Sequence, residues 1–275
     1  MKLQDYLERI GHDGGVRRDL ATFKALHRAH AQNIPYENLD VQLGAPVTRD
    51  AKTVFEKIVT RRRGGWCYEM NGLLGWALRA IGFDVKFLAG GVTRDVSGDT
   101  VVGNHLVLLV DIDGEPWVGD VGFGDGLIDP VPLREGAADG HPLQGNLTPV
   151  GDGWWRYAND PRTGGPKFDF NPAVGDESLL ERHCAFLQTD PSSPFVQNAV
   201  VQRWRGAEHL SLRGRVLRRL TLNADRRSLV NSAEEYVAAL RDEFGIDFPE
   251  AARLWPQIES RHAEIFAGKD PLAGR

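Results

Sequence analysis

A cysteine that follows two glycines and a tryptophan, at the start of a helical pattern, is the residue most suited to chemistry in this chain. Residues 63–71 read RGGWCYEMN, and apolar residues recur at helical spacing from there to Ile81. We therefore expect Cys67 in or just before the first turn of a helix. Unpaired backbone N–H groups and the positive end of the helix dipole favour an anion at that position. A thiol held there is expected to have a lowered pKa and to react as the nucleophilic thiolate.

A histidine and an aspartate further along the chain can complete a catalytic triad with this cysteine. His105 opens an apolar run at residues 106–110, and Asp120 follows a second apolar segment that contains Trp117 and Val118. Cys67, His105 and Asp120 are the residue types expected of a nucleophile, its base and the carboxylate that orients the base.

Other residues that could do chemistry are better explained by structure. Cysteines are often small buried hydrophobes, and Cys184, within a helical stretch, keeps that interpretation. His27 and His30 are spaced to share a helix face, but no third ligand is apparent nearby, so we predict no metal site. Residues 122–126 read GFGDG, which lacks the spacing of a nucleotide-binding loop. Asp120 itself could be a simple turn residue.

The composition excludes several classes of function. The 275 residues are 41% hydrophobic and 26% charged, which is ordinary for a soluble globular protein. A net charge of −5 argues against a nucleic-acid partner. Neither a signal peptide nor a segment of transmembrane length is apparent, so we expect no membrane association. We expect a cytoplasmic protein, whose cysteines stay reduced, in agreement with a free, catalytic Cys67.

Apolar periodicity predicts the elements that position these residues. Helices are expected at residues 3–10, 20–26, 54–59, 67–81, 179–187, 233–244 and 251–266. Strands are expected at residues 85–89, 106–112, 116–121, 154–158, 199–204 and 216–222, with Asp113-Gly114 as a hairpin turn. We predict an α+β fold with a helical bundle at residues 1–82 carrying the nucleophile, an antiparallel β-barrel-like domain at 83–190 carrying His105 and Asp120, and a C-terminal α/β lid at 191–275.

The order and spacing of the triad narrow the class of enzyme. A papain-like protease places its histidine about 130–150 residues after the cysteine, whereas the compact order seen here fits a transglutaminase-like cysteine core. Within that arrangement the chain resembles the arylamine N-acetyltransferases of prokaryotic type. The resemblance rests on four blocks in the family's order: RGGWCYEMN at residues 63–71, IPYENLD at 34–40, DVGFG at 120–124 and LQTDPSSPF at 187–195.

The resemblance implies a function and a set of contacts. Such enzymes transfer an acetyl group from acetyl-CoA, the co-substrate, to an arylamine or hydrazine through an acetyl-cysteine, in a ping-pong cycle that uses no metal. The resemblance also implies a soluble monomer or homodimer. The expected contacts are Tyr68, Val92 and Phe123 for the aromatic ring and Gly122 and Gly124 for the CoA arm. Backbone N–H groups near Cys67 and those of Val102 and Gly103 are expected to hold the oxyanion. Glu37 and Arg63 are expected to form a buried structural ion pair below the site.

Two other functions remain open at this point. An amide synthase of the same fold would use the same triad to close a macrolactam from a carrier-bound acyl chain, and the motifs do not exclude it. A non-catalytic binding module is the other alternative, but the intact triad and glycine pair argue against it.

Overall fold

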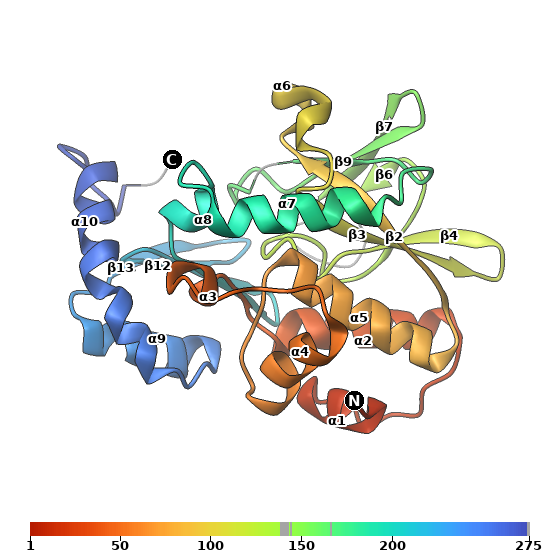
Figure 1. Ribbon diagram of the computed structural model, residues 1–275, viewed down its shortest axis with the longest axis horizontal. Helices are drawn as coiled ribbons and strands as arrows, with labels where there is room; N and C mark the ends of the chain where they lie inside the picture. Colours follow the sequence, from red (N-terminus) through yellow and green to blue (C-terminus); the bar gives the residue numbers. More distant parts are fainter. Residues whose placement is uncertain (138–142, 144, 166, 274–275) are drawn as a thin grey trace.

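Two antiparallel sheets, with helices packed around them, form the architecture of the chain (Figure 1). The computed structural model describes residues 1–137, 143, 145–165 and 167–273. Helices α1, α2, α4 and α5 lie at the lower centre and right of Figure 1, the larger sheet at the upper right, and the smaller sheet with α9 and α10 at the left. The fold is therefore mixed α+β, as predicted.

The elements follow one another along the chain in a nearly helical first third and a mixed remainder. The helices are α1 (Leu3–Arg9), α2 (Leu20–Asn33), α3 (Leu39–Gln42), α4 (Ala51–Phe55), the π-helical η1 (Glu56–Thr60), α5 (Cys67–Ile81), α6 (Arg94–Ser97), the 3₁₀ helix η2 (Gly98–Val101), α7 (Glu177–Thr189), α8 (Pro194–Gln197), α9 (Ala233–Phe244), the 3₁₀ helix η3 (Pro249–Leu254) and α10 (Trp255–Ile265). The strands are β1 (Tyr36–Glu37), β2 (Asp84–Val92), β3 (His105–Ile112), β4 (Glu115–Gly119), β5 (Val131–Pro132), β6 (Gly136–Ala137), β7 (Asn146–Gly151), β8 (Trp154–Ala158), β9 (Phe168–Phe170), β10 (Val200–Arg205), β11 (Glu208–Arg213), β12 (Val216–Leu220) and β13 (Asp225–Leu229).

The N-terminal helices pack on one another and on the larger sheet. The side chain of Asp19 caps α2 by accepting a hydrogen bond from the backbone of Thr22, which satisfies one of the free N–H groups of the first turn. The apolar faces of α1, α2, α4 and α5 share one core with alternate residues of β2 and β3. This core fixes α5, and therefore Cys67, against the strand that begins with His105.

The larger sheet has the order β5-β4-β3-β2-β9-β8-β7-β6 and is curled. Strand β3 is buried on both faces: Leu108 and Val110 meet the helices, while Val107 and Leu109 face the inner side of the curl. Burial on both faces explains why this strand reads as a continuous apolar run rather than an alternating one. Asp113 and Gly114 both have positive φ and form the predicted hairpin turn between β3 and β4.

The smaller sheet combines strands from the first and the last third of the chain. Its order is β1-β10-β11-β12-β13, so an edge strand from the first third pairs with β10, the first of four neighbouring strands from the last third. Leu39, just after β1, lies in the same apolar core as Val201 of β10 and Leu240 of α9. The N-terminal segment is thus part of the packing of the C-terminal region.

Some elements differ from the sequence-based expectation. The prediction of a single helix at residues 251–266 is wrong. The 3₁₀ helix η3 extends to Leu254, and α10 begins at Trp255. Pro249 and Pro256 near the starts of these two elements lack the N–H groups that a continuous α-helix would use. The domain boundaries after residues 82 and 190 stay a prediction. Within the described ranges, no helix is long and apolar enough to cross a bilayer.

The close packing of Gly64, in the turn before Cys67, can be tested by substitution. A side chain at Gly64 would place its Cβ 2.1 Å from the backbone oxygen of Pro35, so Gly64→Ala should destabilise the fold by about 1–3 kcal/mol or more. Gly72 in α5 is a matched control, since among the described residues no atom lies within 4 Å of a Cβ built there. Gly72→Ala should stabilise by up to about 1 kcal/mol through helix propensity. Urea unfolding measures both, and equal effects of the two substitutions would contradict the packing argument.

Candidate active site

Cys67 is the first residue of α5 and is held by the turn that precedes it. Gly65 forms a parallel bridge with Tyr36, and its backbone bonds to Pro35 and Glu37 on either side. The backbone N–H of Trp66 donates to the carboxylate of Glu69 (3.2 Å), which satisfies a free donor at the helix start. The sequence-based placement of Cys67 in the first turn is confirmed.

A buried network of ion pairs lies beneath this turn. The guanidinium of Arg63 donates to Glu37 (2.7 Å) and to Asp40 (3.0 Å), and the ammonium of Lys57 contacts Asp40 (2.8 Å) and Glu69 (2.9 Å). The predicted pair of Arg63 with Glu37 is therefore confirmed, as one part of a larger set. These charges support the turn that carries Cys67.

His105 and Asp120 are in direct contact. His105 is the first residue of β3, Asp120 follows β4, and His105 Nε2 lies 2.7 Å from Asp120 Oδ2. Both residues are buried, each with 1% of its surface exposed. Because a carboxylate can only accept, the Nε2–H of His105 must be the donor, which leaves Nδ1 as the nitrogen free to accept a proton.

The position of Asp120 is determined by hydrogen bonds from three directions. Its Oδ1 accepts from the Asn71 side chain (2.7 Å) and from the backbone of Gly122 (2.8 Å). Its backbone N–H donates to Nε2 of His27 (2.9 Å). Asn71 lies in α5 one turn after Cys67 and also donates to the carbonyl of Leu106 (2.6 Å). The helix that carries the cysteine therefore aligns the aspartate and the strand of the histidine.

The Cys67 sulfur lies beside the backbone on both sides of His105. Its Sγ is 4.0 Å from the carbonyl oxygen of Asn104, and the N–H of Leu106 stabilises negative charge on the sulfur, as does the N–H of Tyr68. Burial nevertheless raises the pKa of the Cys67 thiol, and the charge of Asp120 adds to this effect. Desolvation of the anion thus acts against the expected effect of the helix start, and a thiolate at Cys67 stays a prediction that depends on His105.

Aromatic side chains cover the other side of His105. Its ring centroid lies 5.2 Å from that of Phe123 and 4.7 Å from that of Phe168 in β9. Val92, which pairs with Phe168, belongs to the same apolar cluster. Tyr68 does not: it lies in a separate cluster with Cys67, and its hydroxyl donates to the carbonyl of Gly103 (2.7 Å). Of the three residues predicted to form one apolar wall, the structure brings together Val92 and Phe123.

The predicted oxyanion donors are already engaged. The N–H of Val102 donates to Asp99 (3.1 Å) and that of Gly103 to Gly90 (2.8 Å), so the prediction that these two groups hold an oxyanion is wrong. The short turn before β3 needs these bonds for itself, which the sequence pattern does not reveal. The N–H groups of Tyr68 and Leu106 face the sulfur instead and are better candidates.

The two glycines predicted to contact CoA approach protein groups closely. A Cβ on Gly122 would lie 2.7 Å from the α-carbon of Cys67, and one on Gly124, where φ is +78°, would lie 2.4 Å from the amide of Gln202. Glycine is thus required at both positions by the loop itself. Their contact with CoA stays a prediction.

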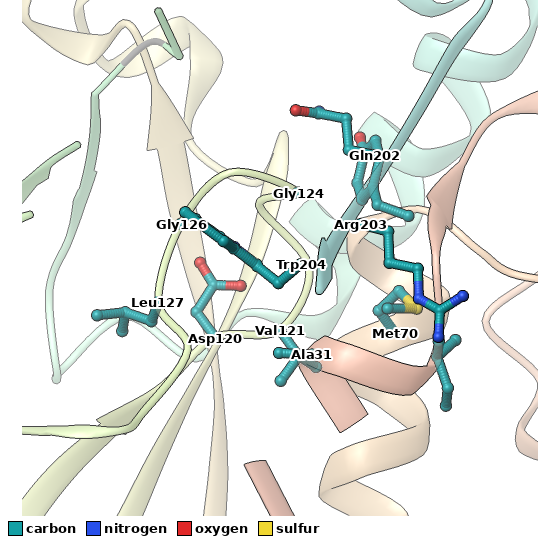
Figure 2. Close-up of a pocket in the computed structure, with 12 residues that line it drawn as sticks. Ala31, Met70, Asp120, Val121, Gly124, Gly126, Leu127, Gln202, Arg203 and Trp204 are labelled. Carbon is teal, nitrogen blue, oxygen red and sulfur yellow. The ribbon is translucent and has the colours of Figure 1, made fainter. Parts of the chain in front are cut away.

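A small enclosed cavity lies behind the aspartate (Figure 2). Its volume is about 10 Å³, close to the space of one water molecule. Figure 2 shows the loop rising from Asp120 to Gly124 and returning past Gly126 to Leu127, with Trp204 of β10 lying across it. The lower side of the cavity is lined by Ala31 of α2 and Met70 of α5. The loop is therefore enclosed between the N-terminal helices and the C-terminal sheet.

Sequence reasoning missed three residues of this site. In the sequence, Asn71 looks like one more residue of the helix. Its position one turn after Cys67, on the same helix face, does indicate that it lies near the site. His27 was considered only as a metal ligand. Phe168 belongs to a strand of three residues, too short for an alternating pattern to be recognised.

Comparisons with known proteins identify the family of the chain. A family profile described as N-acetyltransferase matches residues 19–253. The arylamine N-acetyltransferase of Mycolicibacterium smegmatis is 36% identical over 277 aligned residues, which cover 96% of this chain and 98% of that protein. The chain belongs to the arylamine N-acetyltransferase family. The members of this family are acyltransferases, so the predicted class of enzyme is confirmed.

Solved structures of arylamine N-acetyltransferases share the whole fold. That of the M. smegmatis protein matches with a TM-score of 0.85 and 35% identity, covering 94% of this chain and 98% of that one. The Mycobacterium marinum arylamine N-acetyltransferase, solved in complex with CoA, matches with a TM-score of 0.84 and 30% identity over 94% of this chain and 99% of that one. The similarity therefore extends beyond the motif blocks to nearly the full chain.

The hydrogen bonds of Asp120 predict the effect of Asp120→Asn. Because Oδ1 accepts from two donors, the amide oxygen of asparagine should occupy that site and turn its NH₂ group toward His105. His105 Nε2 would then have to accept, so the proton would move to Nδ1 and block proton uptake from Cys67. We expect kcat to fall by about 10³- to 10⁴-fold with little change in thermal stability. A folded variant with near-normal activity would show that Asp120 is only a turn residue.

The raised thiol pKa predicts that the reactivity of Cys67 depends on His105. Cys67 and Cys184 are both buried, with 2% of their surface exposed. A difference between their alkylation rates therefore reflects the reactivity of the two thiols rather than their accessibility. Burial raises the pKa of Cys184 to about 12. At neutral pH iodoacetamide should label Cys67 at least about tenfold faster than Cys184, because His105 can take the thiol proton. In His105→Gln the two rates, measured by peptide mass spectrometry, should converge; unchanged labelling of Cys67 would contradict a role for His105.

Proposed function

We propose that this protein catalyses the acetyl-CoA-dependent N-acetylation of arylamines and hydrazines through an acetyl group carried on Cys67. The observation that carries the proposal is the buried 2.7 Å contact between His105 and Asp120, set beside the cysteine that begins α5. Membership of the arylamine N-acetyltransferase family supports the choice of acyl donor and acceptor. We also propose that the triad forms a transglutaminase-like core shared between a helical, a β and a C-terminal α/β region.

The first half-reaction is acyl transfer to the enzyme. As the Cys67 sulfur bonds to the acetyl carbon, its proton passes to Nδ1 of His105, so no free thiolate has to persist in the buried site. The carboxylate of Asp120 stabilises the imidazolium that forms. The bond from the acetyl carbon to the CoA sulfur then breaks, and the CoA thiolate takes the proton from His105. The products are acetyl-Cys67 and CoA.

Backbone groups are suited to hold the oxygen during this step. The N–H groups of Tyr68 and Leu106 already face the Cys67 sulfur and can donate to an oxyanion on the adjacent carbon. Tyr68 is in the first turn of α5, where N–H groups lack helical partners. This pair replaces Val102 and Gly103 in the proposed mechanism.

The second half-reaction returns the acetyl group to an amine. The amine nitrogen bonds to the acetyl carbon, its proton passes to His105, and the carbon–sulfur bond to Cys67 breaks. The sulfur recovers the proton from His105, which completes the cycle without a metal. Phe123 and Phe168, whose ring centroids lie 4.9 Å apart, offer an aromatic surface next to the imidazole for the ring of the acceptor.

The macrolactam-forming amide synthase is not favoured as an alternative. It would use the same triad, but the relatives described above carry the name arylamine N-acetyltransferase. Release of free CoA from acetyl-CoA in the presence of an arylamine distinguishes the two activities, since a carrier-bound acyl chain contributes no free CoA.

An acetyl-cysteine intermediate can be tested directly. Incubation with acetyl-CoA alone should add the mass of one acetyl group, mapped to Cys67 and absent in Cys67→Ala. Cys184→Ala is the matched control and should still accept one acetyl group. Initial rates with both substrates varied should give parallel double-reciprocal lines. Intersecting lines without an adduct would instead show direct transfer and remove the assigned role of Cys67.

The acceptor class can be tested on the same adduct. An arylamine or hydrazide should discharge acetyl-Cys67 faster than buffer, and faster than an aliphatic amine at the same concentration. Aliphatic amines are mostly protonated at neutral pH and would have to lose both solvent and proton to react. Faster discharge by the aliphatic amine would contradict the proposed acceptor class.

A further inference from the structure

One histidine of α2 contacts both ends of the loop that follows β4. Nε2 of His27 lies 2.9 Å from the backbone nitrogen of Asp120, and its Nδ1 lies 2.7 Å from the carbonyl oxygen of Ile128. The side chain is completely buried. The loop between these contacts, residues 120–128, contains the candidate carboxylate, Gly122 at the α-carbon of Cys67, and Phe123 at the ring of His105.

These two contacts define the tautomer of His27. A backbone N–H can only donate, so Nε2 must accept from Asp120; a carbonyl can only accept, so Nδ1 must carry the proton. A protonated ring would have a hydrogen on both nitrogens and could not accept from Asp120. Burial lowers the pKa of His27, in agreement with a neutral ring, although the carboxylates of Asp120 and Asp129 act in the opposite direction. His30, one turn further along α2, is a second titratable ring nearby.

We propose that His27 is a positioning residue of the acetyl-transfer reaction, which bridges the two ends of loop 120–128 and thereby holds Asp120 in line with His105. This inference rests on the proposed function for its catalytic consequence. Without the bridge, the buried N–H of Asp120 loses its acceptor, and the backbone that carries the carboxylate is free to shift. A small shift is enough to lengthen the bond to His105 and to move Gly122 away from Cys67.

The surroundings of the loop support this role. Its far end is held by packing, because Ile128 lies in an apolar cluster with Trp204 and Leu220 of the smaller sheet. Arg28, the residue after His27, forms a two-bond ion pair with Asp129, but the arginine is half exposed and such a pair contributes little. His27 is therefore a buried polar link between α2 and the loop.

His30 provides a matched control on the same helix. It is also completely buried, and its Nδ1 bonds to the hydroxyl of Tyr6 in α1 (3.0 Å) instead of to the loop. Replacing either histidine by leucine removes a buried polar group of the same size from the same helix. Only His27→Leu also removes the link to Asp120.

Steady-state kinetics on three variants test the proposal. We expect His27→Leu to lower kcat about 10- to 100-fold, as for a small misplacement of a catalytic group, while KM for acetyl-CoA changes little. His27→Gln should recover part of the loss, because its amide oxygen can replace Nε2 as the acceptor. His30→Leu should lower the melting temperature but leave kcat near that of the wild type. Equal losses of kcat in His27→Leu and His30→Leu, or an unchanged kcat in His27→Leu, would overturn the proposal.

Nitrogen NMR of the histidine rings tests the bridge independently of activity and of variant folding. In the wild-type protein at neutral pH, the ¹⁵N shifts should show His27 neutral, with its proton on Nδ1. A proton on Nε2, or a charged ring, would overturn the bridge itself. Absence of acetyl transfer in the wild type would instead overturn the proposed function, and the ¹⁵N shifts would still decide whether the bridge exists.

Discussion

The position of the candidate nucleophile depends on the buried charges beneath its turn. Two cations, Lys57 and Arg63, are shared among the carboxylates of Glu37, Asp40 and Glu69, which come from separate elements of the first third of the chain. Burial would raise the pKa of Asp40, but the two cations lower it, so that carboxylate stays charged. Burying such groups costs several kcal/mol for each ion, and the loss of one partner leaves another uncompensated. The main effect of the network is therefore to select one conformation of the turn, rather than to raise the free energy of unfolding.

Helix α5 connects this charged network to the rest of the site. Its first residue is Cys67, its third position is Glu69 in the charged network, and Asn71 bonds both to Asp120 and to the carbonyl after His105. The helix is rigid over this length, so the charged network and the triad cannot shift independently. Strands β3 and β4 supply His105 and Asp120 from the opposite side, where burial on both faces of the sheet restricts their movement. Two rigid surfaces thus meet at the triad.

Sequence reasoning found the residues with strong local signals and missed those defined by distant contacts. Cys67, His105 and the turn at Asp113 and Gly114 stand out through their neighbours in the chain, and the strands and helices around them were predicted closely. Phe168 could not be placed, because its role comes from the curl of the sheet that brings β9 beside β2. The raised thiol pKa has the same origin: burial is a property of the packed fold, whereas the helix dipole is visible in the sequence. Strand β13, rich in charged residues at a sheet edge, lacks an apolar pattern altogether.

The burial that raises the thiol pKa is also consistent with the proposed choice of acceptor. A site that disfavours an isolated thiolate disfavours any unpaired charge, including an ammonium ion. An aliphatic amine, with a pKa near that of lysine at about 10.4, would enter mainly as a cation. An aromatic amine is already neutral, and in the proposed reaction its ring would pack against Phe123 and Phe168, which lie beside His105. The same exclusion of water would protect the proposed acetyl thioester on Cys67 from hydrolysis. Selectivity for the amine and persistence of the intermediate would then have one physical cause, the low polarity of the space around the triad.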